Sequence, residues 1–150
     1  MTDPQSVLFC CDQNSVRSPM AEGLMKQLCG AGIYVQSAGV KNDREVDGFA
    51  IAVCDEIGVG LGRHTSRSFD EMRTLGEDIS SFDLIVALSP ASHRKAIELT
   101  RNDHLTVEFW DILDPTGIGE NRDSKLSAYR MTRDQIRAHL KSRFGNCTPA

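Results

Sequence analysis

Two side chains near the start of the chain have the types and spacing for chemistry on an anion. Cys11 is a nucleophile in its thiolate form, and Arg17, six positions later, carries a planar positive charge. The segment 12–16 between them reads D-Q-N-S-V. A thiolate beside a guanidinium would bind a tetrahedral oxyanion and attack its central atom. Because this spacing is common by chance, the elements around the segment decide whether it forms a site.

The flanking sequence predicts a strand before this segment and a helix after it. Residues 7–10, V-L-F-C, form an apolar run. Ser18 is expected to be the N-cap of the helix and Pro19 its first residue, since each suits that position. Segment 11–17 then lies at a helix N-terminus and at the carboxyl end of the first strand, where open α/β sheets bind ligands. Free amides and the helix dipole favour both an anion and a thiolate there.

Helical and extended patterns alternate along the rest of the chain. The first helix ends near Gly30, and helical spacing also predicts helices over 48–57, 69–75, 90–100 and 124–144. Strands are predicted over 33–36, 82–88 and 105–110. This alternation predicts an α/β fold with three αβα layers, in which helices cover both faces of a four-stranded parallel sheet. Residues 1–150 are interpreted as a single domain, with a disordered tail over 145–150.

Composition is that of an ordinary globular protein, with 40% hydrophobic and 25% charged residues. The net charge of −4 argues against nucleic-acid binding. Residues 121–144 nevertheless carry seven Lys or Arg against two Asp. A solvated helix face is the simpler interpretation of these charges, and a docking face for a partner is the alternative. No signal peptide or long apolar span opens the chain, which predicts a cytoplasmic protein that does not bind a membrane.

The five cysteines, Cys10, Cys11, Cys29, Cys54 and Cys147, have irregular spacings that match neither a disulfide framework nor a zinc site. No metal or other cofactor is therefore expected. A reducing cytoplasm would keep a catalytic thiol usable. Because neighbours in a strand face opposite ways, Cys10 is expected to point into the core if Cys11 faces a ligand.

The stretch 7–22, V-L-F-C-C-D-Q-N-S-V-R-S-P-M-A-E, resembles the active-site signature of the low-molecular-weight protein tyrosine phosphatases and their relatives, the thioredoxin-coupled arsenate reductases. Further matches follow in order along nearly the whole chain: Ser37-Ala38-Gly39, His64, Ser66-Arg67, the strand over 82–86, and Asp114-Pro115. The resemblance implies the flavodoxin-like topology of that family and hydrolysis of phosphomonoesters.

The resemblance also implies a role for each residue of the loop. Cys11 would attack phosphorus and form a phosphocysteine. The loop residues would hold the phosphate oxygens through their backbone amides and one guanidinium; they are Asp12, Gln13, Asn14, Ser15, Val16 and Arg17.

Three further residues would support this loop, and one would transfer protons. Ser18 would hydrogen-bond the thiolate, whereas Asn14, which tolerates positive φ, would hold the loop with His64 and Ser37. Asp114 would protonate the departing oxygen and then activate water. Asp111 is a nearby competitor, but only Asp114 matches the Asp-Pro pair of the family.

Two features of the sequence disfavour phosphotyrosine as the substrate. Family members that act on tyrosine line a deep cleft with aromatic residues, whereas Thr116 and Gly117 follow the Asp-Pro pair here, and residues 42–43 at the other wall are Asn-Asp. Asp12 adds a negative charge beside the site of a dianion. The expected substrate is a phosphorylated protein or a small phosphoester.

Two alternative functions stay open. An arsenate reductase would share the first step but would need two further cysteines near the segment after the third strand. The chain has Ser89 there, no cysteine between Cys54 and Cys147, and Val16 in place of a second loop cysteine. The other alternative is a catalytically weak anion-binding protein on the same fold, although such a protein needs no nucleophile and no general acid.

Overall fold

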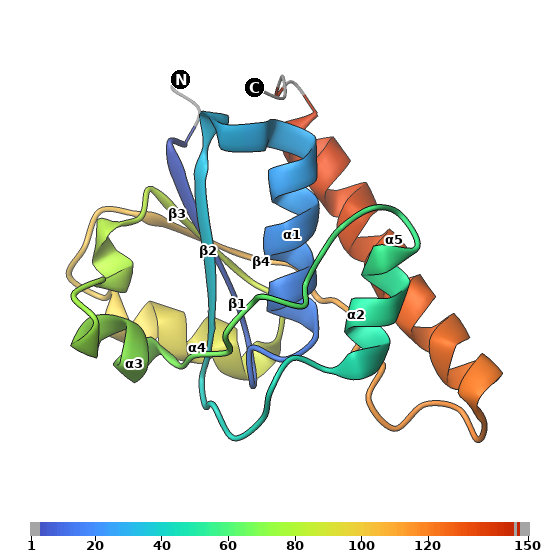
Figure 1. Cartoon of the computed structure of the whole chain (residues 1–150). Helices are drawn as coiled ribbons and strands as arrows, with labels where there is room; N and C mark the ends of the chain where they lie inside the picture. Colours follow the sequence, from blue (N-terminus) through green and yellow to red (C-terminus); the bar gives the residue numbers. More distant parts are fainter. Residues whose placement is uncertain (1–3, 146, 148–150) are drawn as a thin grey trace.

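The computed structural model describes residues 4–145 and 147 and contains a four-stranded parallel sheet in the order β2-β1-β3-β4 (Figure 1). The strands are β1 (Ser6–Cys11), β2 (Tyr34–Gly39), β3 (Leu84–Ala87) and β4 (Thr106–Phe109). The helices are α1 (Arg17–Cys29), α2 (Gly48–Asp55), α3 (Phe69–Thr74), α4 (Pro90–Leu99) and α5 (Arg122–Phe144), with 3₁₀ turns at Gly30–Gly32 and Ile79–Ser81. The predicted α/β class and parallel sheet are confirmed.

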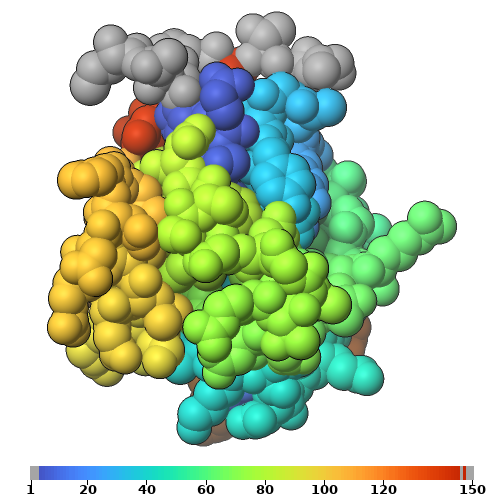
Figure 2. Space-filling model, turned by 90° about the vertical axis from the view of Figure 1, so that its left-hand side faces the viewer, coloured from blue at the N-terminus to red at the C-terminus, as the bar shows by residue number. Residues whose placement is uncertain are grey.

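Helices cover both faces of this sheet, so the molecule has three layers. One face packs against α1, α2 and α5 and the other against α3 and α4 (Figure 1). Figure 2 shows the second face, on which the segments around α3 and α4 lie side by side over the strands. Strand β1 supplies both cores because its side chains alternate: Phe9 and Cys11 face one apolar cluster, and Leu8 and Cys10 face the other. Cys10 is fully buried, as predicted.

Strand β2 extends three residues beyond the predicted 33–36 strand. It pairs with β1 along its whole length, and the last pair in register is Cys11 with Gly39. The small residues Ser37 and Ala38 carry no β-pattern of their own, but ladder hydrogen bonds to β1 keep them extended. The extra residues bring Ser37 and Gly39 beside the loop that follows Cys11.

The predicted start of the first helix is wrong. Helix α1 begins at Arg17, Met20 N–H donates to the Val16 carbonyl, and the side chain of Val16 makes no capping bond. Ser18 is thus the second residue of the helix rather than its N-cap. Its backbone N–H donates to Cys11 Sγ at 3.4 Å, so the thiol takes the part that a capping side chain normally plays.

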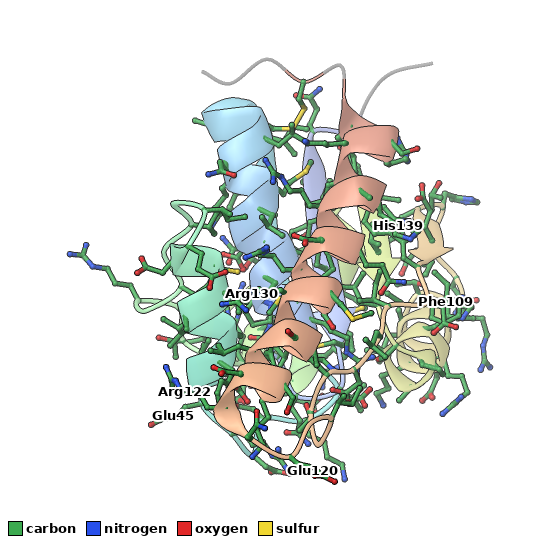
Figure 3. All side chains as sticks on the ribbon, turned by 90° about the vertical axis from the view of Figure 1, so that its right-hand side faces the viewer. Glu45, Phe109, Glu120, Arg122, Arg130 and His139 are labelled. Atoms are coloured by element: carbon green, nitrogen blue, oxygen red, sulfur yellow. A yellow bond between two sulfur atoms is a disulfide. The ribbon has the colours of Figure 1, made fainter. Side chains whose placement is uncertain are left out.

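A disulfide joins Cys29, the last residue of α1, to Cys147, which follows α5 (Figure 3). This corrects the expectation that the cysteines form no disulfide. Helices α1 and α5 pack against each other, which brings two residues 118 positions apart together, and sequence spacing carries no such information. Cys147 also packs partly buried against the core, contrary to the expected disordered tail. The remaining tail positions, 146 and 148–150, lie outside the described residues.

The basic residues of α5 are partly paired within the protein. Arg130 and Arg133 both bind Glu56, at 2.6 and 2.7 Å, and Figure 3 shows Arg130 on α5 where this helix runs beside α2. Hydrogen bonds from Arg130 and Arg133 lower the pKa of Glu56 to about 2, although its partial desolvation acts the other way. Arg143 binds Glu108 at 2.9 Å. These ion pairs favour the interpretation that the basic residues of α5 form an ordinary solvated helix face. A docking face for a partner on α5 stays a prediction.

No helix in the described part of the chain is both long and apolar enough to cross a membrane.

Candidate active site

The loop between β1 and α1 is held by the side chain of Asn14, which is fully buried. Its φ of 55° is the only positive value at a non-glycine residue in the described chain. The amide nitrogen donates to the hydroxyls of Ser18 and Ser37, at 2.8 and 2.9 Å. The amide oxygen accepts from Arg67 N–H at 3.0 Å and from His64 Nε2 at 2.9 Å. All four hydrogen-bonding positions of the amide are therefore used, and His64 carries its proton on Nε2.

The carbonyl groups of this loop are bound from outside. Backbone N–H groups of residues 40, 41 and 47 donate to the carbonyls of residues 11, 12 and 15, respectively. Ser66 donates its hydroxyl to the Asn14 carbonyl at 2.6 Å. Among residues 4–145 and 147, no acceptor is found for the backbone N–H groups of residues 13–16. These donors are available to an anion at the N-terminus of α1.

Gly39 is required beside the loop because the two backbones touch. A Cβ atom at this position would lie 2.6 Å from Asn14 N and 2.8 Å from the Lys41 carbonyl oxygen. Both are backbone atoms, which cannot move aside without displacing the loop. The sequence match at Ser37-Ala38-Gly39 thus corresponds to a close contact that fixes the loop.

Cys11 lies at the entrance to the loop, almost fully buried. Its sulfur is 3.0 Å from the Ser18 hydroxyl oxygen and accepts the Ser18 N–H. Asn14 donates to the Ser18 oxygen, and the Ser18 hydroxyl has two acceptors within reach, the sulfur and the Ala38 carbonyl oxygen at 3.5 Å. Ser18 thus places both its backbone N–H and its hydroxyl beside the sulfur.

Arg17 lies between two carboxylates. Its buried guanidinium donates to the carbonyls of Leu88 and Ile112, at 3.3 and 3.2 Å, which anchor it. Both of these bonds come from Nη1, and Nη2 is 3.4 Å from Asp12 Oδ2 and 3.8 Å from Asp114 Oδ2. The second oxygen of Asp12 is buried and has no hydrogen-bond partner. Asp12 thus contacts the same guanidinium that would bind an anion.

The structure brings Asp114, not Asp111, to the loop. Asp114 Oδ1 accepts hydrogen bonds from the backbone N–H and the hydroxyl of Thr116, at 3.0 and 2.7 Å, and its other oxygen faces Arg17. Asp111 is exposed, and its carbonyl oxygen accepts from Gln135. Of the two aspartates, Asp114 has the geometry of an acid at the mouth of the site.

Comparison with known proteins agrees with this geometry. Residues 6–146 match the model of the family described as low molecular weight phosphotyrosine protein phosphatase. The chain belongs to this family. It is 30% identical to an arsenate reductase of Staphylococcus aureus over 93% of this chain and 95% of the relative. Among solved structures, an arsenate reductase in its phosphate-binding state superposes with a TM-score of 0.75, at 28% identity over 96% of this chain and 99% of that chain.

A tyrosine phosphatase of Erwinia amylovora shares the fold, with a TM-score of 0.73 at 20% identity, over 98% of this chain and 95% of that chain. The family, described by its phosphotyrosine phosphatases, uses cysteine-dependent catalysis, and relatives of this chain are named arsenate reductases. The chain is therefore an enzyme of the low-molecular-weight phosphatase family.

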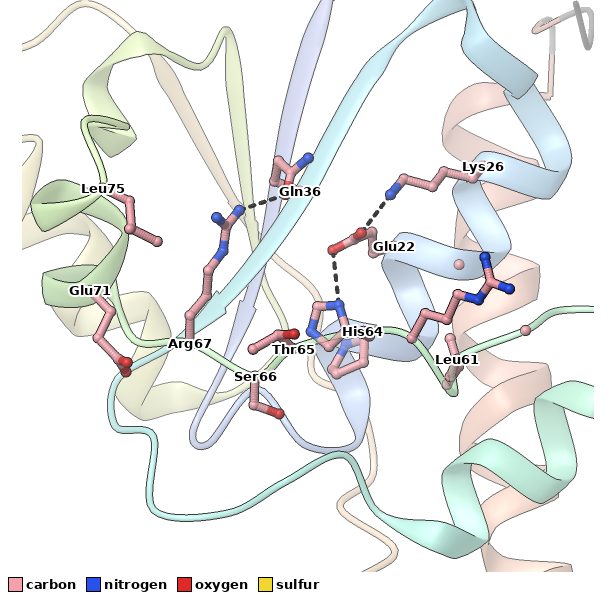
Figure 4. Close-up of a pocket in the computed structure, with 14 residues that line it drawn as sticks. Glu22, Lys26, Gln36, Leu61, His64, Thr65, Ser66, Arg67, Glu71 and Leu75 are labelled. Carbon is pink, nitrogen blue, oxygen red and sulfur yellow. Dashed lines mark hydrogen bonds and ion pairs between the residues drawn. The ribbon is translucent and has the colours of Figure 1, made fainter.

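A buried carboxylate that sequence reasoning missed supports the loop from behind. Glu22 accepts from Ser37 at 2.7 Å and from Lys26 at 2.6 Å, and its Oε1 is 3.7 Å from His64 Nδ1. Figure 4 shows Glu22, Lys26 and His64 meeting in one pocket between α1 and the segment that carries His64. Burial lowers the pKa of His64, and the positive charges of Arg67 and Lys26 act in the same direction against the opposing effect of Glu22. Glu22 is the last residue of the signature stretch 7–22, and this position was the indication in the sequence that it could belong to the site.

The segments expected to form the walls of the cleft carry polar or small residues. Thr116 and Gly117 follow Asp114 in the chain and are exposed, and Asn42 donates to the Ser66 carbonyl at 2.9 Å. The large apolar side chains exposed near Asp114 in the chain are aliphatic, Leu113 and Ile118.

The other free thiols of the described chain, Cys10 and Cys54, are buried. Burial raises the pKa of the Cys10 thiol, and it raises that of Cys54 to about 12 despite the nearby charge of Arg133. Both stay protonated at neutral pH, which makes them poor nucleophiles. Among residues 4–145 and 147, no group of three or more His, Cys, Asp or Glu side chains is arranged to hold a metal ion.

Proposed function

We propose that the protein hydrolyses phosphomonoesters through a phosphocysteine intermediate. The observation that carries the proposal is the arrangement around Cys11. Its sulfur lies beside Ser18 at the N-terminus of α1, next to a row of backbone N–H groups without acceptors, and Arg17 and Asp114 lie close to each other. A site that only bound anions would need neither the sulfur nor the acid.

In the first step, the Cys11 thiolate attacks phosphorus, so a P–S bond forms while the P–O bond to the leaving group breaks. Asp114 gives its proton to the departing oxygen. The loop amides and Arg17 hold the three remaining oxygens, which requires Arg17 to exchange Asp12 for the substrate. In the second step, Asp114 takes a proton from water, the water oxygen attacks phosphorus, and the P–S bond breaks. Ser18 stabilises the thiolate that leaves.

Arsenate reduction is the second candidate, because the curated relatives carry that name. The arsenic centre must receive two electrons from thiols, and a relay within the chain needs reactive cysteines besides Cys11. Cys10 and Cys54 have raised pKa values, and Ser89, after β3, is hydrogen-bonded to Ser92 at 2.7 Å. These observations favour the phosphatase.

The charge and shape of the cleft favour a substrate other than phosphotyrosine. Asp12 opposes a dianion, and residues 116–117 and 42–43 give a phenyl ring no aromatic partner. We therefore propose a phosphorylated protein or small phosphoester whose leaving group needs no aromatic contact. Cys11 must be reduced to act, which favours the cytoplasm, whereas the Cys29–Cys147 disulfide is typical of an oxidising compartment.

The test uses p-nitrophenyl phosphate and an alkyl phosphate with the parent, Cys11→Ser and Asp114→Ala. We expect steady turnover by the parent and none by Cys11→Ser. Asp114→Ala should lose most activity on the alkyl phosphate, because its leaving oxygen needs a proton. If Asp114→Ala loses activity equally on both substrates, Asp114 is not the general acid. Arsenate turnover with thioredoxin or glutaredoxin, in the absence of phosphatase activity, would establish the second candidate instead.

A further inference from the structure

Asp12 places a negative charge next to the guanidinium that would bind the substrate. Its Oδ2 is 3.4 Å from Arg17 Nη2, which is long for a hydrogen bond between two charged groups. Its other oxygen, Oδ1, is buried and accepts no hydrogen bond. In the described part of the chain, Arg17 is also the one ion-pair partner of Asp12. The charge of Asp12 is thus only partly compensated within the protein.

A bound phosphate group would weaken this compensation further. Arg17 Nη1 is already bound to the carbonyls of Leu88 and Ile112, so a phosphate competes with Asp12 for the rest of the guanidinium. A carboxylate that is left without a donor in a partly buried site destabilises the complex. The phosphate dianion beside it adds repulsion between like charges. Binding of an uncharged alkyl phosphate is therefore penalised by Asp12.

The neighbouring segments supply no excess of positive charge. Residues 40–47, whose backbone binds the loop, carry two basic and three acidic side chains, and residues 111–117 carry two aspartates and no basic side chain. Lys41 donates its backbone N–H to the Asp12 carbonyl. Its side chain makes no ion pair with Asp12 in the part of the chain that the structure describes. A positive charge on the substrate itself would compensate Asp12.

The geometry of the two aspartates indicates where on the substrate that charge would lie. Asp114 Oδ2 is 3.8 Å from the same Nη2 that faces Asp12, so both carboxylates meet at one nitrogen. The side chains of Asp12 and Asp114 are 49% and 50% exposed, so a ligand can reach each of them. Because Asp114 would protonate the ester oxygen, the leaving group passes beside Asp12. A two-carbon link holds an ammonium group about 3–4 Å from that oxygen, close enough for one leaving group to touch both carboxylates.

We propose that Asp12 is a specificity-determining residue that selects a phosphorylated amino alcohol, with its ammonium group two carbons from the ester oxygen. The ammonium group binds the exposed side of the Asp12 carboxylate while the phosphate binds Arg17. It offsets the charge that Asp12 adds, and it stabilises the negative charge that develops on the departing oxygen. Asp114 still gives its proton to that oxygen, so both steps of hydrolysis are unchanged. This inference rests on the proposed function.

The test compares two phosphate esters of nearly equal size, 2-aminoethyl phosphate and propyl phosphate, which differ in the charge at the end of the chain. The measurement is kcat/KM for each ester with the parent, Asp12→Asn and Asp111→Asn. We expect the parent to prefer the 2-aminoethyl ester about tenfold, because water partly screens a charge pair at a half-exposed site. Asp12→Asn should lower kcat/KM for this ester and raise it for propyl phosphate. Asp111→Asn is the matched control, since Asp111 is an exposed aspartate of the same segment as Asp114 and should keep the parent's preference.

The opposite responses of the two esters separate recognition of the ammonium group from support of Arg17. If Asp12 only positioned Arg17, Asp12→Asn would lower kcat/KM equally for both esters, and that result would overturn the inference. A parent that does not prefer the 2-aminoethyl ester would also overturn it and would leave the proposed function intact. If neither ester is turned over, the same opposite responses must appear in their inhibition constants against p-nitrophenyl phosphate, and their absence overturns the inference. A parent without activity on p-nitrophenyl phosphate would overturn both proposals.

Discussion

Replacing Asn14 with alanine should release the phosphate loop, and the structure sets the size of the effect. The substitution leaves the N–H donors of His64 and Arg67 without their acceptor. Each buried donor without a partner costs about 1–3 kcal/mol. Alanine at a φ of 55° costs roughly a further 1–2 kcal/mol, which asparagine largely avoids. Ser18 and Ser37 lose a donor but keep their own acceptors, Cys11 and Glu22.

We therefore expect Asn14→Ala to lower the free energy of unfolding by about 4 kcal/mol, a large part of the ~5–15 kcal/mol typical of native proteins. Urea unfolding followed by circular dichroism measures this loss, and the melting temperature should fall by about 10 °C. Asn102→Ala is the control, because Asn102 is exposed in a turn and should change stability by less than about 0.5 kcal/mol. A loss below about 1 kcal/mol in Asn14→Ala would refute the reasoning.

Three further predictions concern the same site. Gly39→Ala should lower turnover about 100-fold because its Cβ would displace the loop, whereas Gly32→Ala, with nothing within 4 Å, should match the parent; equal rates would contradict the close contact. Folding lowers the pKa of His64, so the unfolded chain binds a proton at a higher pH than the folded chain does. The free energy of unfolding should therefore fall as the pH drops below about 6.5. His64→Gln should weaken that dependence in urea unfolding, and an unchanged slope would count against it. Asp12→Asn should tighten competitive inhibition by inorganic phosphate about tenfold, and weaker inhibition would show that Asp12 does not oppose dianions.

The part of the site closest in sequence to Cys11 could be predicted from the chain alone or from the resemblance. The strand–loop–helix pattern around 7–22 predicts a loop at a helix N-terminus. The positive φ of Asn14 could also be expected, because asparagine adopts the left-handed conformation more readily than most residues. Asp114 is different, because no spacing shows that it meets Arg17 across 97 positions. Only the resemblance pointed to Asp114.

The missed residues share a physical cause. Glu22 lies on a helix whose pattern indicates an apolar face, and its carboxylate accepts from Ser37, 15 positions away in the sequence. The Cys29–Cys147 disulfide likewise depends on how α1 and α5 pack. The predicted start of the first helix was wrong because a serine followed by a proline is typical of an N-cap. In the structure the helix begins at Arg17, and the Cys11 sulfur accepts the Ser18 N–H as a capping side chain would. Long-range pairing of this kind is decided by tertiary packing rather than by local sequence.

Detection of the covalent intermediate tests the central claim most directly. Asp114→Ala should be mixed with p-nitrophenyl phosphate, whose leaving group departs without an acid, and quenched with denaturant during turnover. Peptide mass analysis should then find one phosphoryl group on the peptide that contains Cys11, and none in Cys11→Ser. The phosphoryl group should accumulate because the variant lacks the base for the second step. Steady release of phosphate by the parent with no phosphoryl group on Cys11 in the variant would contradict the account.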